Sequence, residues 1–269
     1  SDGDTTGALQ DLALIETMSG HIMSYPSLLS LMINVALDDV RVRGIEHVLA
    51  NNIKPLAGLI ALPVKAHSSG LDTFRKTLVI DGLAMTQGLA FMLTSDERLF
   101  TEIPLETSIY RVFFAPYDLE NDKKKTEILA KPAGTYEELF NNLKQSQEIM
   151  RDRGGLLTRI AGPSYDNYFS RIMSYEARRA LADTAFAVAA YKAAGGKYPE
   201  KLEELVPAYI DRIPFDPFTG KPVMMRPVQG GLELYSAGKN SFIKSESVKG
   251  PVNFFIGKEA YEVFRVKAD

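Results

Sequence analysis

Residues that could perform acid–base or metal chemistry are few and widely spaced in this chain. Its three histidines are His21, His47 and His67. None has the HxxxH or HExxH spacing that would place two zinc ligands on one face of a helix. We therefore interpret the histidines as surface or capping residues and not as metal ligands.

The best candidates for a catalytic carboxylate pair are Asp38 and Asp39, with Asp11 and Glu16 nearby. Adjacent helical residues point about 100° apart, so Asp38 and Asp39 do not share a face as a catalytic dyad would. We interpret these carboxylates as members of a solvated helix face. The alternative is a hydrolase that gathers carboxylates from the helical region into a cleft.

Sequence patterns of nucleophilic catalysis and of nucleotide binding are weak or missing. The chain has no cysteine, which excludes a thiolate nucleophile, a CxxC redox pair and zinc-finger ligation. It has no Gly-x-Ser-x-Gly turn, and its Ser-x-x-Lys match at Ser241 and Lys244 lacks a helical setting. The pairs Gly154-Gly155 and Gly195-Gly196 follow predicted helices, whereas a phosphate-binding loop precedes one. The sequence favours a non-catalytic role.

The composition is that of an ordinary globular protein. The 269 residues are 45% hydrophobic and 24% charged, and the formal net charge is −3. That charge argues against a nucleic-acid-binding protein, which would normally show a strongly basic face. The length allows one large domain or two.

The elements of the first two-thirds of the chain are predicted to be helices. Apolar residues at three- and four-residue spacings predict helices at residues 6–23, 26–50, 55–66 and 71–93, with a short helix starting near Ser95. Thr135 and Glu138 form a capping box, which predicts another helix that ends at Gly154-Gly155. Residues 109–114 fit helix and strand equally. The charged stretch Asp118–Pro132 is interpreted as a solvated loop or a frayed helix.

The sequence changes character near Ser174. Alanine dominates residues 176–194, which predicts a helix with one side formed by Ala177, Leu181, Ala185 and Val188. From Ala185 to Tyr191 this helix is apolar all round, which implies burial on more than one side. Beyond Pro207 further prolines exclude a regular helix, and we expect strands at residues 223–226, 232–236, 252–256 and 261–266.

Several short motifs follow one another within residues 174–241. Their principal members are Tyr198, Pro199, Leu205, Pro207, Pro214, Asp216, Pro217, Gly220, Pro222, Tyr235, Ser236 and Gly238. Their order and spacing resemble the globular end of the major pseudopilins of type II secretion. They also resemble uncharacterised exported bacterial proteins that attach such a module to a helical region.

Local chemistry explains three of these motif residues. Pro199 fixes the backbone angle at the start of a short helix. The Asp216 side chain can accept a backbone N–H in a turn with Pro217, and Gly220 supplies a positive φ angle.

The resemblance implies an exported, membrane-tethered bacterial protein that acts in assembly or binding at the cell envelope, with other envelope proteins as partners. The chain starts at Ser1 in a polar stretch without an initiator methionine, which suggests either a trimmed chain or a mature form whose leading segment was removed. Its longest mostly apolar run, Leu28–Leu37, is shorter than the ~20 residues that a membrane span needs.

Two departures limit what the resemblance implies. Pseudopilins of this kind bind calcium in an acidic loop after the Tyr-Ser-x-Gly strand, but residues 239–246 offer one carboxylate and two lysines. We therefore expect no cofactor, with calcium as the alternative. In addition, a pseudopilin has one N-terminal helix that is both anchor and polymerisation spine. A long helical region precedes the module here, which speaks against fibre assembly by that route.

The sequence as a whole predicts a mainly α protein with a small α+β C-terminal module. A multi-helix region would occupy residues 1–170. A long helix and a small antiparallel sheet would occupy residues 171–269.

Overall fold

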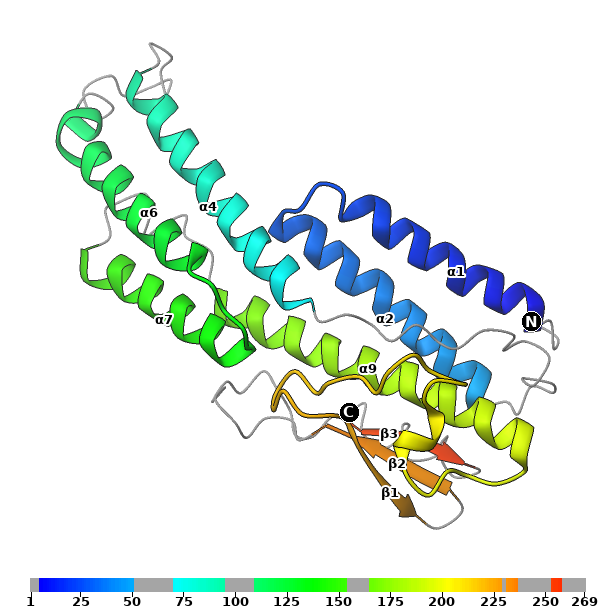
Figure 1. Cartoon of the computed structure of the whole chain (residues 1–269). Coiled ribbons are helices and arrows are strands. Elements are labelled where there is room, and N and C mark those ends of the chain that lie inside the picture. The colour runs from blue at the N-terminus through cyan, green and yellow to red at the C-terminus, as the bar shows by residue number, and fades with distance from the viewer. Residues whose placement is uncertain are drawn as a thin grey trace, which may run out of the picture. The chain divides into compact units, whose positions relative to one another are not determined.

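The fold is mainly helical with a small antiparallel sheet near the C-terminus, as the sequence predicts (Figure 1). The computed structural model describes residues 5–50, 70–94, 109–153, 165–228, 231–236 and 253–257. The chain divides into two compact units. We call residues 1–24, 32–70 and 167–269 the sheet-containing unit, and residues 25–31 and 71–166 the three-helix unit.

The sheet-containing unit begins with a pair of helices, α1 (Thr5–Ile22) and α2 (Leu28–Ala50). The Ser19 hydroxyl donates a hydrogen bond to the Asn34 side chain, which joins the two helices. A Cβ atom on Gly44 would lie 2.9 Å from Leu12, so this glycine lets α1 approach α2 closely. Both helices match their predicted ranges. The sequence places them in the N-terminal helical region, and the fold groups α1 and most of α2 with the C-terminal elements.

Helix α9 (Tyr165–Gly195) is buried on two sides, as the apolar segment 185–191 predicts. Four residues on its predicted inner side are fully buried: Ala177, Leu181, Ala185 and Val188. Val42 and Ile45 of α2 join the last three of these residues in one core, which also includes Leu234 from the sheet. The helix stops at Gly196, which has φ +73° and donates its N–H to the Lys192 carbonyl at 2.7 Å.

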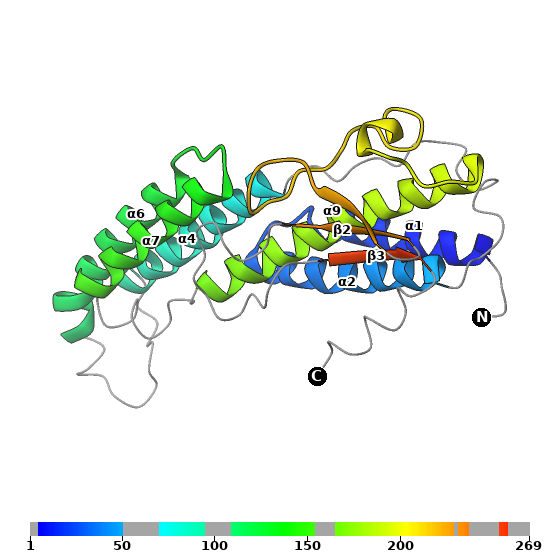
Figure 2. The same ribbon diagram turned by 90° about the horizontal axis from the view of Figure 1, so that it is seen from below.

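A short 3₁₀ helix, η2 (Leu202–Leu205), leads into the three strands β1 (Met224–Val228), β2 (Gly231–Tyr235) and β3 (Asn253–Gly257). The strands are antiparallel in the order β1-β2-β3, and Tyr235 faces Met224 on one side and Asn253 on the other. Pro227 lies on the edge strand β1, where a missing N–H is tolerated. Figures 1 and 2 together place α9 between α2 and this sheet.

The three-helix unit contains α4 (Leu71–Thr94), α6 (Ala115–Ala130) and α7 (Tyr136–Arg153), with α6 packed against both others. A single π-helical turn, η1 (Tyr110–Phe114), precedes α6. The predicted cap of α7 is present, because the Glu138 N–H donates to Thr135 Oγ1 at 3.1 Å. The Glu138 carboxylate accepts the N–H of Gly134 at 2.7 Å.

Residues 118–132 are predicted to be a solvated loop or a frayed helix; the helix is confirmed, and the loop and the solvated character are wrong. Helix α6 covers most of this stretch, and its buried polar residues include Asp118, Asn121, Asp122 and Lys125. Tyr110 donates to Asp118 at 2.7 Å and Thr86 donates to Asp122 at 2.6 Å. Asp118 and Asp122 have hydrogen-bond partners outside α6 and Lys125 pairs with Asp122, so the buried face of this helix does not show the apolar pattern that marks one.

Several predictions fall on residues that the structure does not describe. These are the helix at residues 55–66, the short helix near Ser95, the helix end at Gly154-Gly155 and the strand at 261–266. The other strands match β1, β2 and β3 within two residues at each end.

We predict opposite effects of alanine at two glycines of α4. A Cβ on Gly82 would lie 2.5 Å from Thr126 Oγ1 and 3.2 Å from Thr126 Cγ2, so rotation of the threonine does not remove the clash. Gly82→Ala should lower the free energy of unfolding by about 1–3 kcal/mol. No atom lies within 4 Å of the position that a Cβ on Gly88 would take, so Gly88→Ala should raise the free energy of unfolding by up to about 1 kcal/mol. Urea unfolding followed by circular dichroism measures both, and an equal shift in the same direction would contradict the packing.

Candidate functional site

A half-open groove of about 320 Å³ lies between α2 and α9 within the sheet-containing unit. The α2 wall is mostly apolar and consists of Met32, Val35, Ala36, Asp39 and Val42. The α9 wall is mostly polar and consists of Ser170, Arg171, Ser174, Tyr175 and Arg178. Residues three and four apart on a helix share one face, and both sets have that spacing.

Asp39 is the carboxylate that lines this groove, and two arginines neutralise it. Arg178 of α9 donates to one carboxylate oxygen of Asp39, and Arg43 pairs with the other. Arg178 also lies 3.8 Å from Glu46. Burial raises the pKa of Glu46, and the attraction of Arg178 partly offsets that effect.

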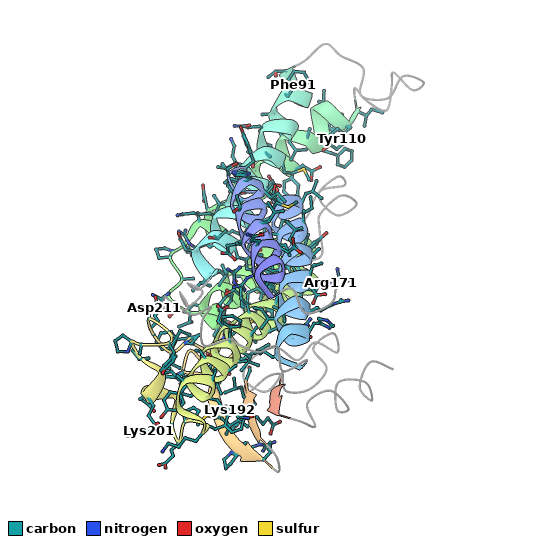
Figure 3. All side chains as sticks on the ribbon, turned by 90° about the vertical axis from the view of Figure 1, so that its right-hand side faces the viewer. Phe91, Tyr110, Arg171, Lys192, Lys201 and Asp211 are labelled. Atoms are coloured by element: carbon teal, nitrogen blue, oxygen red, sulfur yellow. The ribbon has the colours of Figure 1, made fainter. Side chains whose placement is uncertain are left out.

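Two α9 residues of the groove wall lack partners within the described part of the chain. Arg171 is exposed and makes no hydrogen bond or ion pair there. It projects from its helix toward solvent (Figure 3). Ser170 is only 1% exposed, and its hydroxyl makes no hydrogen bond to the described residues.

A buried charge cluster lies next to the groove. Asp38, which is completely buried, accepts a hydrogen bond from Arg179 Nη1 at 2.6 Å and another from the Tyr175 hydroxyl. Arg179 Nη2 also donates to both oxygens of Glu16 on α1, at 2.8 and 3.0 Å. One guanidinium of α9 therefore joins carboxylates from α1 and α2.

A second arginine extends the cluster. Arg41 of α2 lies 3.3 Å from Asp183 of α9 and 3.4 Å from Glu16 of α1. Asp183 is 2% exposed, so its charge needs this partner. Burial alone would lower the pKa of Arg179, but Asp38, Glu16 and Asp183 outweigh it and raise the pKa. The arginine therefore stays charged, and the carboxylates of the cluster are held in ion pairs.

The interpretation of Asp38 as a solvated residue is wrong, because its two partners on α9 enclose it. The predicted divergence of the two aspartates is confirmed, since Asp38 pairs with Arg179 and Asp39 with Arg178. Asp11 is exposed, as are His21 and His47. The third histidine, His67, lies outside the described residues.

The polar face of α9 was not predicted from the sequence. Arg171, Tyr175 and Arg178 recur at spacings of four and three, which is the pattern of one helix face. Ion-pair partners on α1 and α2 lie more than 130 residues away in the sequence, so the spacing reveals the face but not what it binds.

The C-terminal motif residues form a different arrangement, in which Asp216 is central. Its Oδ1 accepts the N–H of Phe218 at 3.0 Å and the hydroxyl of Ser236 at 2.8 Å. Asp216 is completely buried and its own N–H donates to the Lys221 carbonyl at 2.7 Å. Gly220 has φ +65°. The predicted aspartate turn and the positive φ are both confirmed, and the turn is joined to the end of β2.

Two other motif prolines contact this turn, and most of the remaining motif residues lie elsewhere in the module. Pro214 is buried and accepts the N–H of Val223, and Pro222 bridges to Phe215. Tyr198 lies beside Lys192, and Tyr235 lies at the end of β2. Pro199, before η2, and Leu205 are buried. Pro217 is half-buried and Pro207 is exposed. Gly238 lies outside the described residues.

Within the described ranges, no group of three or more acidic or histidine side chains is arranged to hold a metal ion. The loop at residues 239–246, to which the calcium alternative refers, lies outside those ranges. No helix that the structure describes is long and apolar enough to cross a membrane.

Comparison with known proteins yields no relative. No family model, no curated protein and no solved structure matches this chain. The likeness to pseudopilins therefore depends on the motif residues themselves, and a function has to be argued from the geometry of the groove and the module.

We predict that the buried cluster is a major source of stability. Arg179→Met leaves Asp38 buried without its arginine partner, so the free energy of unfolding should fall by about 3–5 kcal/mol. Arg43→Met removes one of the two arginine partners of Asp39. Because the Arg43 side chain is 71% exposed, this change should lower the free energy of unfolding by less than about 1 kcal/mol. Denaturant titration compares the two variants. Equal losses of unfolding free energy in the two variants would show that burial does not determine how much an ion pair stabilises this protein.

We also predict that the Asp216 turn depends on an acceptor and not on a charge. Asp216→Ala removes the acceptor for Phe218 and Ser236 and should lower the free energy of unfolding by about 2–4 kcal/mol. Asp216→Asn keeps a side chain of the same shape with one acceptor oxygen. The loss of unfolding free energy should therefore be less than half of the loss in Asp216→Ala. Thermal unfolding compares the stability of the two variants. A larger loss of stability in Asp216→Asn than in Asp216→Ala would contradict the prediction.

Proposed function

We propose that this chain is the soluble head of an exported, membrane-tethered bacterial protein that binds other proteins of the cell envelope. The observation that carries the proposal is the C-terminal module. The pseudopilin-like motif residues are spread over 41 positions from Tyr198 to Gly238. Half of them, Pro214, Asp216, Pro217, Gly220, Pro222 and Ser236, form or contact one turn, where Asp216 joins the turn to the end of β2. The hydrogen bonds of the Asp216 turn make the module a preformed unit that can present a surface to a partner.

The packing of α9 favours binding by this head over polymerisation. In pseudopilins the long helix is the spine of a fibre, so its outer face must be available to other subunits. Here Val42 and Ile45 of α2 share the core with α9, and Arg178 and Arg179 of α9 pair with α2 carboxylates. The chain therefore covers with its own residues the face that a fibre would need.

The alternative, a hydrolase using carboxylates of the helical region, has less support. The buried carboxylates Asp38 and Asp183 are paired with arginines, and so is Asp39 in the groove. General acid–base catalysis needs a carboxyl group that can exchange a proton with a substrate near neutral pH. In each of these carboxylates an arginine lies against an oxygen, where a substrate would have to bind.

The proposal predicts where the protein is found and what it touches. The full-length gene product, expressed in its source bacterium, should fractionate with the envelope and become protease-sensitive when the outer layer is permeabilised. A photo-crosslinking amino acid at Lys221, exposed in the Asp216 turn, should capture envelope proteins. The same amino acid at Lys124 on α6 serves as the control position, because its side chain is also exposed.

Recovery of the intact protein in the cytosolic fraction would contradict the export part of this proposal. Crosslinking at Lys124 but not at Lys221 would contradict the assignment of partner binding to the module. The Asp216→Ala variant should lose the Lys221 crosslinks, since it disrupts the turn that carries this position.

A further inference from the structure

The groove between α2 and α9 has two walls of different chemistry. Met32, Val35 and Ala36 supply apolar surface from α2, and the α9 wall supplies hydroxyl and guanidinium groups. An apolar wall facing a small number of polar groups is the usual character of a small-ligand site. The volume of about 320 Å³ is at the lower end of such sites, which span roughly 300–1,000 Å³.

The unmatched charge of the groove is positive. Its lining includes the two cations Arg171 and Arg178 and the single carboxylate Asp39. Arg178 is paired with Asp39, and Arg43 also pairs with Asp39 from outside the lining. Arg171 makes no ion pair with the residues that the structure describes. A ligand that matched this groove would therefore carry a negative group at the Arg171 end.

The polar groups near Arg171 favour an oxygen anion. Ser170 adjoins Arg171 in sequence and Ser174 follows it by one helical turn, and all three line the groove. The Ser170 hydroxyl is buried without a hydrogen-bond partner among the described residues, a state that is rare for a buried polar group. A guanidinium binds a carboxylate through two parallel N–H···O bonds, and hydroxyl groups can add a third donor.

We infer that this groove binds a small ligand with an unbranched or lightly branched apolar chain that ends in a carboxylate. The carboxylate pairs with Arg171, and the chain lies against Met32, Val35 and Ala36. Two sources share this chemistry: a short fatty acid and the C-terminal residues of an apolar peptide. The inference does not depend on the envelope role proposed above, since it concerns the lining of the groove alone.

Calorimetric titration of the purified full chain tests this inference with four probes. These are decanoate below its aggregation concentration, decanol, acetyl-Leu-Leu with a free carboxylate, and the amide of the same peptide. At least one of the two acids should bind, and at least about tenfold more tightly than its neutral counterpart. Binding of decanoate identifies an acyl ligand, and binding of the peptide acid identifies a chain terminus.

Two pairs of variants locate the site. Arg171→Gln should weaken the bound acid at least about tenfold, and Lys197→Gln, which removes an exposed charge beyond the end of α9, should not. Ala36→Phe should fill the groove and abolish binding, whereas Ala193→Phe, at another exposed helical alanine, should leave it unchanged. Far-ultraviolet circular dichroism confirms that each variant is folded.

The inference is overturned if neither acid binds at millimolar concentration or if the neutral probes bind as tightly as the acids. It is also overturned if a folded Arg171→Gln or Ala36→Phe variant binds as the wild type does. Equal weakening by Arg171→Gln and Lys197→Gln would show general electrostatic attraction and would overturn it too.

Discussion

The buried guanidinium of Arg179 is the interaction on which the sheet-containing unit depends. It contacts Asp38 of α2 and Glu16 of α1 from its position on α9, so one side chain fixes three helices. A buried charge is costly unless it is paired and hydrogen-bonded, and this requirement makes the arrangement specific. Arg41 repeats the pattern between Asp183 and Glu16. Displacing α2 from α9 would expose apolar surface and separate the buried Asp38 and Asp183 from their arginines, and displacing α1 would remove Glu16 from both arginines.

This constraint determines what each face of α9 can do. One face packs against α2, where Val42 and Ile45 enter the common core, and the other packs against the sheet. The many alanines of α9 allow both layers to approach closely, because their side chains occupy little space. On the sheet side, the Asp216 turn holds the chain against the end of β2 through Ser236. The groove lies where the α2 and α9 walls separate.

Much of the fold can be predicted from the sequence, because periodicity is a local property. The apolar spacing of α1, α2 and α4 gives their ranges within two residues, and the apolar segment 185–191 correctly indicates burial on two sides. The turn at Asp216 follows from one aspartate, one proline and one glycine. These features depend on residues that are neighbours in the chain.

The errors concern buried polar residues, whose partners are distant in sequence. Helix α6 is expected from the sequence to be a solvated loop or a frayed helix, because Asp118, Asp122 and Lys125 are charged and charged residues normally indicate solvent. Asp38 was predicted to be solvated because it is charged too. Its partner Arg179 lies 141 residues away, so no local pattern indicates the pairing. The Arg171 wall of the groove was missed because its apolar counterpart is on α2. No local pattern connects such residues, and only the tertiary structure brings them together.

The central claim is that α1, α2 and α9 form one block held together by Arg179. Hydrogen exchange measured by mass spectrometry tests it most directly in the wild type and in the Arg179→Met variant. The account predicts slow exchange in both residues 38–45 of α2 and residues 177–190 of α9 in the wild type. It also predicts that the variant loses protection in α1 and α2 together. Fast exchange of α2 in the wild type, or loss of protection in α1 alone, would contradict the account.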